Sequence, residues 1–391
     1  MRFKDYFHIP AITAGFIAVL VGYTGSAVIV FQAAQAAGAD ASQIGSWMMA
    51  LGIGMGISSL GLSWYYKMPI VTAWSTPGAA LLVTSLDGVS LAQATGAFLF
   101  SAALVILVGI TGWFARIMDR IPLSIASAML AGILFQFGID AFVALESRFE
   151  LVMIMFLTYI GAKALYPRYA VLLVLIVGIA LSEIQGLLDF SGFGVTIGSL
   201  TWVQPEFSIA TLISVGIPLF IVTMASQNIP GVVVLRASGY SPPVSSSISW
   251  TGVATLLLAP FGGFAINLAA LTASICAGPE AHEDPQRRYL AGISNGICYL
   301  ILGLFGATVA GLIAIFPAEF VLALAGLALL GTIATSLHGA MADQGSREAA
   351  IITFLVTASG INLFGIGAAF WGLVGGALAL MLSWKRIYAS H

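Results

Sequence analysis

The polar residues best able to do chemistry in this chain are uncharged and lie inside apolar stretches. Ser226, Gln227 and Asn228 occupy consecutive positions just ahead of Pro230, and the segment Gly22-Tyr-Thr-Gly-Ser26 interrupts an earlier apolar run. Buried hydroxyls and amides in a membrane need hydrogen-bond partners, which either neighbouring helices or a bound solute can supply. Both alternatives stay open for any single residue.

Two further segments predict interrupted helices. From Met68 to Trp74 an extended, β-branched piece leads into Ser75-Thr-Pro77, the pattern of a helix N-terminus with proline in its first turn. Residues 260–268 place two glycines and an extended piece before an apolar helix expected at 269–277. Short kinked spans are the alternative. Unwound backbone at membrane depth is tolerated beside a cavity, and paired broken helices indicate a transport site.

We therefore expect these four segments to surround one cavity. Two segments would contribute hydroxyls and amides, and the other two would contribute helix ends, whose N–H groups attract anions. The candidate substrate-binding residues are Tyr23, Thr24, Ser26, Thr72, Trp74, Ser75, Thr76, Gln227, Asn228, Phe264, Ile266 and Asn267.

Motifs for other chemistry are absent or misplaced. No lysine follows a glycine, so the chain lacks the Gly-Lys-Ser/Thr signature of an ATP-driven pump. Residues 292–296 match Gly-x-Ser-x-Gly, but they begin an apolar span, and His338 and Asp343 follow in the wrong order for a hydrolase. The histidines are scattered and the two cysteines lie in apolar surroundings. We expect no catalytic residue, metal or cofactor, and no enzyme activity.

The composition places these segments in a lipid bilayer. The chain of 391 residues is 60% hydrophobic and 8% charged, against about a quarter charged in soluble domains. Its long runs are apolar on every face, which favours helices over outer-membrane strands. The formal net charge of −2 gives no reason to expect a nucleic-acid partner.

Fourteen apolar runs are candidate membrane spans, at about 20 residues per span. If the N-terminus is cytoplasmic, thirteen of the 14 lysines and arginines fall on the inside and only Arg148 falls outside. Such a bias supports a multi-pass protein with both termini in the cytoplasm. The runs are residues 9–38, 43–66, 69–86, 91–115, 122–139, 150–166, 169–188, 208–229, 244–261, 265–278, 289–315, 318–337, 349–363 and 366–384.

Weak internal similarity suggests that the spans form two halves of seven. Residues 107–112 and 304–309 occupy equivalent places ahead of Pro122 and Pro317. Chance likeness between apolar helices is the alternative. We predict an all-α polytopic membrane protein with 14 transmembrane segments in a 7+7 inverted repeat, segments 3 and 10 each being broken into a short strand and a half-helix.

Several segments resemble the benzoate membrane transporters of bacteria, the BenE type, over essentially the whole chain. They are residues 69–80, with Ala73-Trp-Ser-Thr-Pro-Gly78, 222–231, with Ala225-Ser-Gln-Asn228, 275–282, 354–360 and 369–373. That family looks like a distant relative of the uracil and nucleobase symporters and of the sulfate and bicarbonate carriers. The resemblance implies import of benzoate or a similar aromatic acid with a proton, across the bacterial inner (cytoplasmic) membrane.

The resemblance also implies how the single membrane domain, residues 1–391, is divided. Residues 1–118 and 207–315 would form a substrate-carrying core subdomain, and residues 119–206 and 316–391 a gate subdomain. A homodimer formed through the gate subdomain is a candidate assembly.

One departure bears on the substrate. The nucleobase relatives have glutamates in spans eight and ten, where this chain has Gln227 and, in span ten, Ile266 and Asn267. Neutral amides and helix N-termini suit an anion better than a nucleobase. A nucleobase or inorganic-anion carrier of the same fold is the alternative, and a channel is less favoured because no rings of charge are visible.

The proton has no obvious carrier in the predicted core. The acids nearest the membrane are Asp140, Glu183, Glu280 and Glu283, all toward span ends. We expect the proton to travel on or beside the substrate carboxyl group, whose charge a low-dielectric pocket disfavours. A boundary acid that reaches the site through water is the alternative.

The predicted topology can be tested by labelling single cysteines. Asp87→Cys and Arg236→Cys, each in a background in which serine replaces Cys276 and Cys298, place thiols in loops expected on opposite faces. A membrane-impermeant thiol reagent added outside should label position 87 and leave position 236 unlabelled. Labelling of both positions from the same face would contradict the topology.

Overall fold

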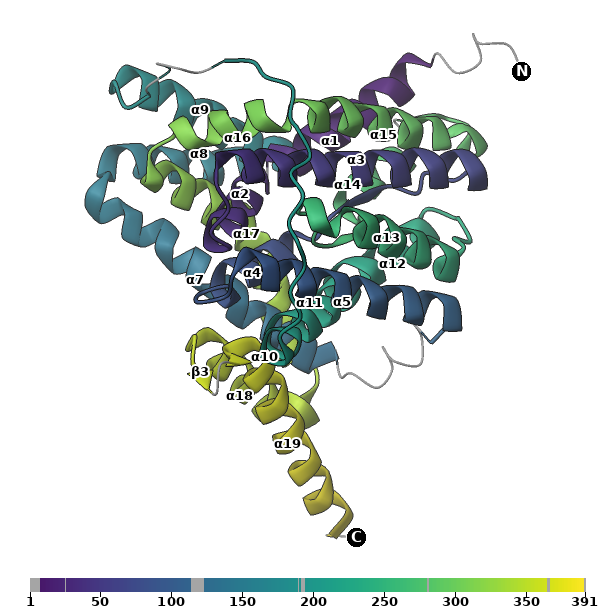
Figure 1. Ribbon diagram of the computed structural model, residues 1–391, viewed down its shortest axis with the longest axis vertical. Helices are drawn as coiled ribbons and strands as arrows, with labels where there is room; N and C mark the ends of the chain where they lie inside the picture. Colours follow the sequence, from purple (N-terminus) through teal and green to yellow (C-terminus); the bar gives the residue numbers. More distant parts are fainter. Residues whose placement is uncertain are drawn as a thin grey trace.

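The computed structural model describes residues 8–24, 26–113, 123–188, 190, 194–279, 281–363 and 366–389 (Figure 1). Helices dominate these residues, with four short strands and several 3₁₀ or π turns labelled η. The first half contains α1 (Ile9–Thr24), α2 (Ala27–Ala36), α3 (Ala41–Tyr66), β1 (Thr72–Trp74), α4 (Thr76–Ser85), α5 (Leu91–Thr111), α7 (Leu123–Ser147), α8 (Phe149–Leu165), η2 (Pro167–Tyr169) and α9 (Ala170–Ile184).

The second half follows after an extended segment. It contains α10 (Ile209–Thr211), η3 (Leu212–Gly216), α11 (Ile217–Thr223), η4 (Met224–Asn228), α12 (Ile229–Ala237), α13 (Val244–Leu258), η5 (Ala259–Phe261), β2 (Ile266–Leu268), α14 (Leu271–Ala277), η6 (Pro285–Arg287), α15 (Tyr289–Leu304), α16 (Gly306–Ile315), α17 (Ala318–Met341), η7 (Gln344–Ser346), α18 (Arg347–Ala358), β3 (Asn362–Leu363), β4 (Ile366–Gly367) and α19 (Ala368–Ala389).

Two segments far apart in the sequence form a small antiparallel sheet. β1 pairs with β2, with Thr72 opposite Leu268 and Trp74 opposite Ile266. The pairing extends beyond the strands, because Ala269 N–H donates to Val71 O and Ser75 N–H donates to Ala265 O, both at 2.9 Å. Extended pieces are predicted here from the sequence, and they lie side by side. The expected helix at 269–277 begins two residues late, at Leu271, because Ala269 is still bonded to β1.

Hydroxyl groups of α3 hold β1 in place. The Thr72 hydroxyl lies 2.6 Å from Ser58 Oγ and 2.9 Å from Ser59 Oγ. Thr72 N–H donates to Ser59 Oγ (2.9 Å), and Ser63 Oγ donates to Ile70 O (3.0 Å). The strand edge that faces away from β2 is therefore satisfied by side chains.

Other side chains hold β2 in the same way. Ile266 N–H donates to Thr255 Oγ1 of α13 (2.9 Å), and Leu268 N–H donates to Asn228 Oδ1 (3.0 Å). In the amide orientation that satisfies both of its polar atoms, Asn267 donates to Leu268 O (2.9 Å) and accepts from Ser75 N–H (3.0 Å). The two-stranded sheet is thus enclosed by hydrogen bonds on both edges.

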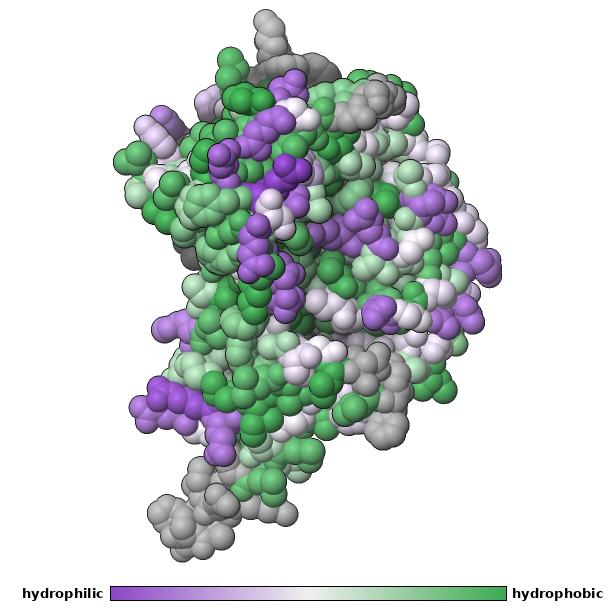
Figure 2. Space-filling model, turned by 90° about the vertical axis from the view of Figure 1, so that its left-hand side faces the viewer, coloured by the Kyte–Doolittle hydropathy of each residue, from purple (hydrophilic) through white to green (hydrophobic). Residues whose placement is uncertain are grey.

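The long helices suit a membrane. Six helices of the described residues are long and apolar enough to cross one, or up to eight if each of two bent pairs forms one span. The bends are 42° between α1 and α2 and 67° between α15 and α16. The fourteen predicted spans stay a prediction, because some of them correspond here to shorter helices or to strand–helix pairs. Hydrophobic side chains cover much of the face in Figure 2, as expected for a surface in contact with lipid.

Glycines allow the helices of the core to approach closely. A Cβ added at Gly52 of α3 would collide with the backbone of Gly303 on α15, and one added at Gly303 would lie 3.0 Å from Gly52 Cα. The two helices run side by side in Figure 1. Backbone contact of this kind is the common use of small residues between membrane helices.

An extended segment, residues 194–208, runs over these helices to α10 (Figure 1). Backbone hydrogen bonds fix it at three separate places. Gly198 N–H donates to Leu304 O (2.8 Å), Val203 N–H to Pro260 O (2.8 Å) and Glu206 N–H to Ala92 O (3.0 Å). The longest predicted loop is therefore bonded to elements from both halves of the chain.

Candidate functional site

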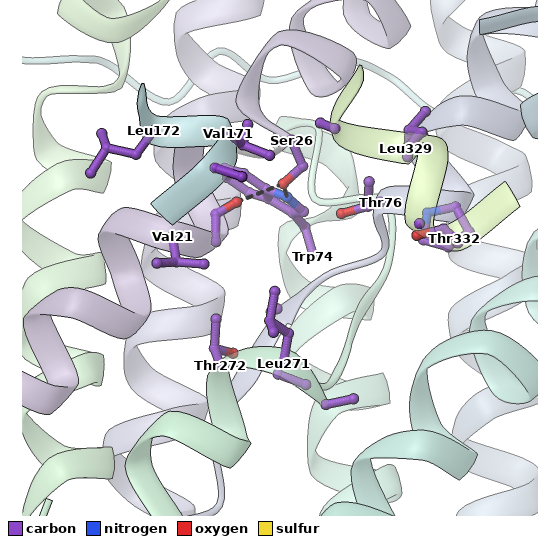
Figure 3. A pocket seen from close by; sticks show the side chains of 18 of the residues that line it. Val21, Ser26, Trp74, Thr76, Val171, Leu172, Leu271, Thr272, Leu329 and Thr332 are labelled. Atoms are coloured by element: carbon purple, nitrogen blue, oxygen red, sulfur yellow. Dashed lines mark hydrogen bonds between the residues drawn. The ribbon is translucent and has the colours of Figure 1, made fainter. Parts of the chain in front are cut away.

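A cavity of about 350 Å³ lies at the end of the small sheet, where β1 becomes α4 (Figure 3). One part of its wall comes from α1, β1, α4, η4, α15 and the start of α14, and the other part comes from α8, α9 and α17. The polar or aromatic residues that line it are Ser26, Trp74, Thr76, Tyr159, Lys163, Gln227, Thr272, Tyr299 and Thr332. Apolar side chains fill most of the remaining wall, as in other small-molecule sites.

Trp74 is held in a fixed orientation at one side of the cavity. Its Nε1–H donates to Ser26 Oγ (2.7 Å), and that hydroxyl donates to Gly22 O of α1 (2.8 Å). Figure 3 draws both bonds. The Tyr23 ring packs against the indole, with centroids 4.7 Å apart. Trp74 therefore presents a rigid apolar face whose only polar atom is already bonded.

Gln227 reaches the cavity from a local distortion of its helix. In η4 the Ile229 N–H donates to Met224 O, five residues back, as in a π-helix. Pro230 follows and has no N–H to donate, which weakens the regular helix ladder at this point. The Gln227 side chain lines the cavity and forms no hydrogen bond with the described residues. Single π turns of this kind often lie at functional sites.

Further polar groups at or near the cavity have no partner in the described part of the chain. Thr272 Oγ1 is buried and unpaired within the described part of the chain, as is Tyr23 Oη behind Trp74. At the start of α4, Ser75 Oγ accepts from Gly78 N–H (3.0 Å) and Pro77 has no N–H. In the first turn of α4, the backbone N–H of Thr76 therefore has no acceptor among the described residues. A ligand with hydrogen-bonding oxygens would satisfy such groups.

The structure places four of the sequence-predicted residues on the cavity: Ser26, Trp74, Thr76 and Gln227. Thr72, Ser75, Asn228, Ile266 and Asn267 instead form or support the sheet that ends at the cavity. Tyr23 lies behind Trp74, and Phe264 packs against Trp47 (5.9 Å) and Phe98 (6.1 Å) in the core. The side chain of Thr24 lies outside the described part of the structure. A role for each in binding stays a prediction.

No local sequence signal marks the part of the wall that comes from α8, α9 and α17. Tyr159 and Lys163 come from α8, Val171 and Leu172 from α9, and Thr332 from α17. In the sequence these helices have the composition of ordinary apolar spans. The charge of Lys163 contributes there only to the cytoplasmic bias of lysine and arginine. Nothing in the sequence around Tyr299 of α15 or Thr272 of α14 marks either residue as part of a binding site.

The described titratable groups are scattered, apart from one pair of histidines. Among the described residues no group of three or more His, Cys, Asp or Glu side chains could hold an ion. The fold brings His8 and His282 together, with ring centroids 4.1 Å apart. In the loop after α14, burial and then the neighbouring His8 lower the pKa of His282, and its Nδ1 accepts from Asp284 N–H (3.0 Å). This imidazole is therefore largely neutral at neutral pH.

Comparison with known sequences gives matches over nearly the whole chain. The model of the family described as "Benzoate membrane transport protein" (BenE) matches residues 5–382. "Inner membrane protein YdcO" of Escherichia coli (strain K12) is 50% identical over 375 residues, which is 95% of each chain. The "Benzoate membrane transport protein" of Acinetobacter baylyi is 41% identical over 382 residues, covering 98% of this chain and 97% of that protein.

Solved structures share the fold at low identity. The transmembrane domain of the cyanobacterial bicarbonate transporter BicA gives a TM-score of 0.62 at 16% identity, over 96% of this chain and 98% of that chain. SLC26A9 gives a TM-score of 0.65 at 13% identity, over 98% of this chain and 66% of that chain. The chain thus has the fold of these helical, polytopic membrane proteins.

Two adjacent amides should respond differently to substitution. Asn228→Ala leaves the buried Leu268 N–H without its acceptor and should destabilise the fold by about 1–3 kcal/mol. Gln227→Ala removes an amide that bonds to no described residue and should leave stability nearly unchanged. Thermal unfolding of the two purified variants in the same detergent checks this. Equal melting temperatures would contradict the structural role of Asn228.

Proposed function

The chain belongs to the family of benzoate membrane transport proteins, and from that membership we propose that it imports benzoate, or a similar aromatic carboxylate, together with a proton. It is a membrane transporter and not an enzyme. We place the substrate in the cavity beside β1 and α4 and couple its import to a proton.

The composition of the cavity wall is the structural observation that supports this substrate class. Trp74 and Tyr299 offer aromatic faces, while Thr76, Gln227 and Thr272 offer donors with no partner among the described residues. No acidic side chain is among the described residues that line the cavity. Flat apolar walls suit an aromatic ring, and neutral donors without nearby carboxylates suit an anion. A nucleobase is less well served, because among the described residues only neutral amide and hydroxyl oxygens, and no carboxylate, are offered to its N–H groups.

The proposal includes the architecture expected from the sequence. The chain would form 14 spans in a 7+7 inverted repeat, with β1–α4 and β2–α14 as the broken third and tenth spans. Residues 1–118 and 207–315 would move as the core, against a gate of residues 119–206 and 316–391. The antiparallel pairing of β1 with β2 supports this, because equivalent segments of an inverted repeat meet in that way.

The membrane location, the orientation and the pairing of two copies belong to the same proposal. The chain would lie in the bacterial inner membrane with both termini in the cytoplasm, and two copies would pair through the gate subdomain. The inner-membrane relative supports the location, and the bias of lysine and arginine toward one side supports the orientation.

Uptake by purified protein in proteoliposomes tests the substrate. Labelled benzoate should accumulate, whereas uracil and sulfate should not. Thr272→Val and Gln227→Ala should each weaken benzoate uptake at low concentration by about two- to tenfold, the effect of one net hydrogen bond. The matched control is Thr335→Val, since Thr335 is exposed and its hydroxyl bonds to Gly331 O of its own helix. Uptake of uracil in place of benzoate would refute the proposal.

Proton coupling is proposed to need no dedicated carboxylate. Glu183 and Glu283 are exposed and do not line the cavity, Asp140 accepts from Gln136 (2.6 Å), and Glu280 lies outside the described residues. The proton would therefore travel on or beside the substrate carboxyl group, because burial disfavours its charged form.

The coupling can be tested by neutralising the three glutamates among these acids one at a time. Glu183→Gln, Glu280→Gln and Glu283→Gln should leave benzoate accumulation in a pH gradient largely intact, with benzoate-dependent proton uptake as the direct readout. If one substitution abolished accumulation but preserved benzoate exchange, that residue would be the proton relay.

A further inference from the structure

Lys163 is the one charged side chain among the described residues that line the cavity. It lies in the last turn of α8 and is exposed, whereas Trp74, which also lines the cavity, is only 3% exposed. The lysine therefore marks the open end of the cavity.

The position of Lys163 on its helix places it between two faces. Ile154, Leu157 and Ile160 of α8 are exposed and follow one another at intervals of three. Met155, Tyr159 and Lys163 follow one another at intervals of four and form another face. Along that face Met155 is fully buried, while Tyr159 and Lys163 line the cavity. The lysine thus lies at the border between the buried face of α8 and its exposed face, next to Tyr159 on the cavity.

The ammonium group has no counter-charge in the described part of the chain. The only ion pair found there joins Arg287 to Asp284, 4.0 Å apart. Lys67, another lysine at the end of an apolar helix, instead lies over the rings of Tyr289 (4.7 Å) and Trp64 (5.4 Å). Lys163 has neither kind of partner among the described residues. An unpaired cation at a cavity with no described acidic wall gives that cavity a positive potential.

We propose that Lys163 is the specificity-determining cation of the site, pairing with the carboxylate of the solute while Tyr159, one turn earlier, contacts its ring. This inference rests on the proposed function, because it assumes an aromatic carboxylate in this cavity. It assigns charge recognition to α8, outside the four segments around which the sequence-predicted site is built. A solute held between Lys163 and Thr76 would contact both the proposed gate and the proposed core.

Two structural explanations of Lys163 predict a different outcome. A lysine in the last helical turn interacts with the helix dipole, and a cytoplasmic lysine helps to set membrane orientation. Neither role depends on whether the ligand is charged. The charge of the ligand is therefore the variable that separates recognition from scaffolding.

The test measures equilibrium binding of benzoate and of neutral benzamide to the purified protein by calorimetry. Lys163→Gln should weaken benzoate binding about three- to tenfold, the range for a partly solvated charged hydrogen bond, and should change benzamide binding little. Lys163→Arg should restore most of the benzoate affinity. High salt should weaken benzoate binding to the wild type more than to Lys163→Gln.

Lys67→Gln is the matched control, since it removes a lysine that does not line the cavity, and it should leave both affinities unchanged. Thermal unfolding of each variant confirms that it is folded. Equal losses for benzoate and benzamide, or no loss for either, would overturn the role of Lys163. Absence of benzoate binding to the wild type would instead overturn the proposed function.

Discussion

A peptide group buried away from water must find a hydrogen-bond partner, and this constraint governs the centre of the molecule. β1 and β2 are only three residues long, and their residues are almost all buried. In lipid such strands are tolerated only if protein satisfies both of their edges. Here each strand satisfies the other, and hydroxyls or amides from α3, α13 and η4 satisfy the outer edges at Thr72, Ile266 and Leu268. Most of the polar side chains in this region serve that purpose.

The polar groups that line the cavity are those that the sheet and the helix cap do not use for their own hydrogen bonds. Asn228 is bonded to β2, whereas Gln227, the preceding residue on the π turn, bonds to no described residue and lines the cavity. Ser75 caps α4, whereas Thr76 lines the cavity. Successive helical residues point in different directions. In each pair of adjacent polar residues, one therefore bonds to the sheet or caps the helix, and the other faces the cavity. The bonded residue fixes the strand ends, and this fixes where the donors of the other residue point.

The part of the wall from α8, α9 and α17 is more apolar. α8, α9 and α17 contribute mostly apolar side chains, with Tyr159, Lys163 and Thr332 as the polar exceptions. Two groups of helices that are separate in the sequence thus enclose one space, with fixed donors on one side and a long, flexible cation on the other. Since the ammonium group of a lysine sits on a flexible stem, it can follow a solute over a larger distance than the fixed donors near the sheet can.

The sequence alone determined the helical membrane class, the two extended segments, the helix start at Ser75 and the family, because composition, proline, glycine and β-branched residues act locally. It also named Ser26, Trp74, Thr76 and Gln227, which line the cavity. Only the tertiary structure decided which member of each polar pair faces the cavity, since that depends on which neighbour takes the hydrogen bond. The same holds for Thr272, Tyr299 and Lys163: they meet only when distant helices pack, and no local pattern records that packing.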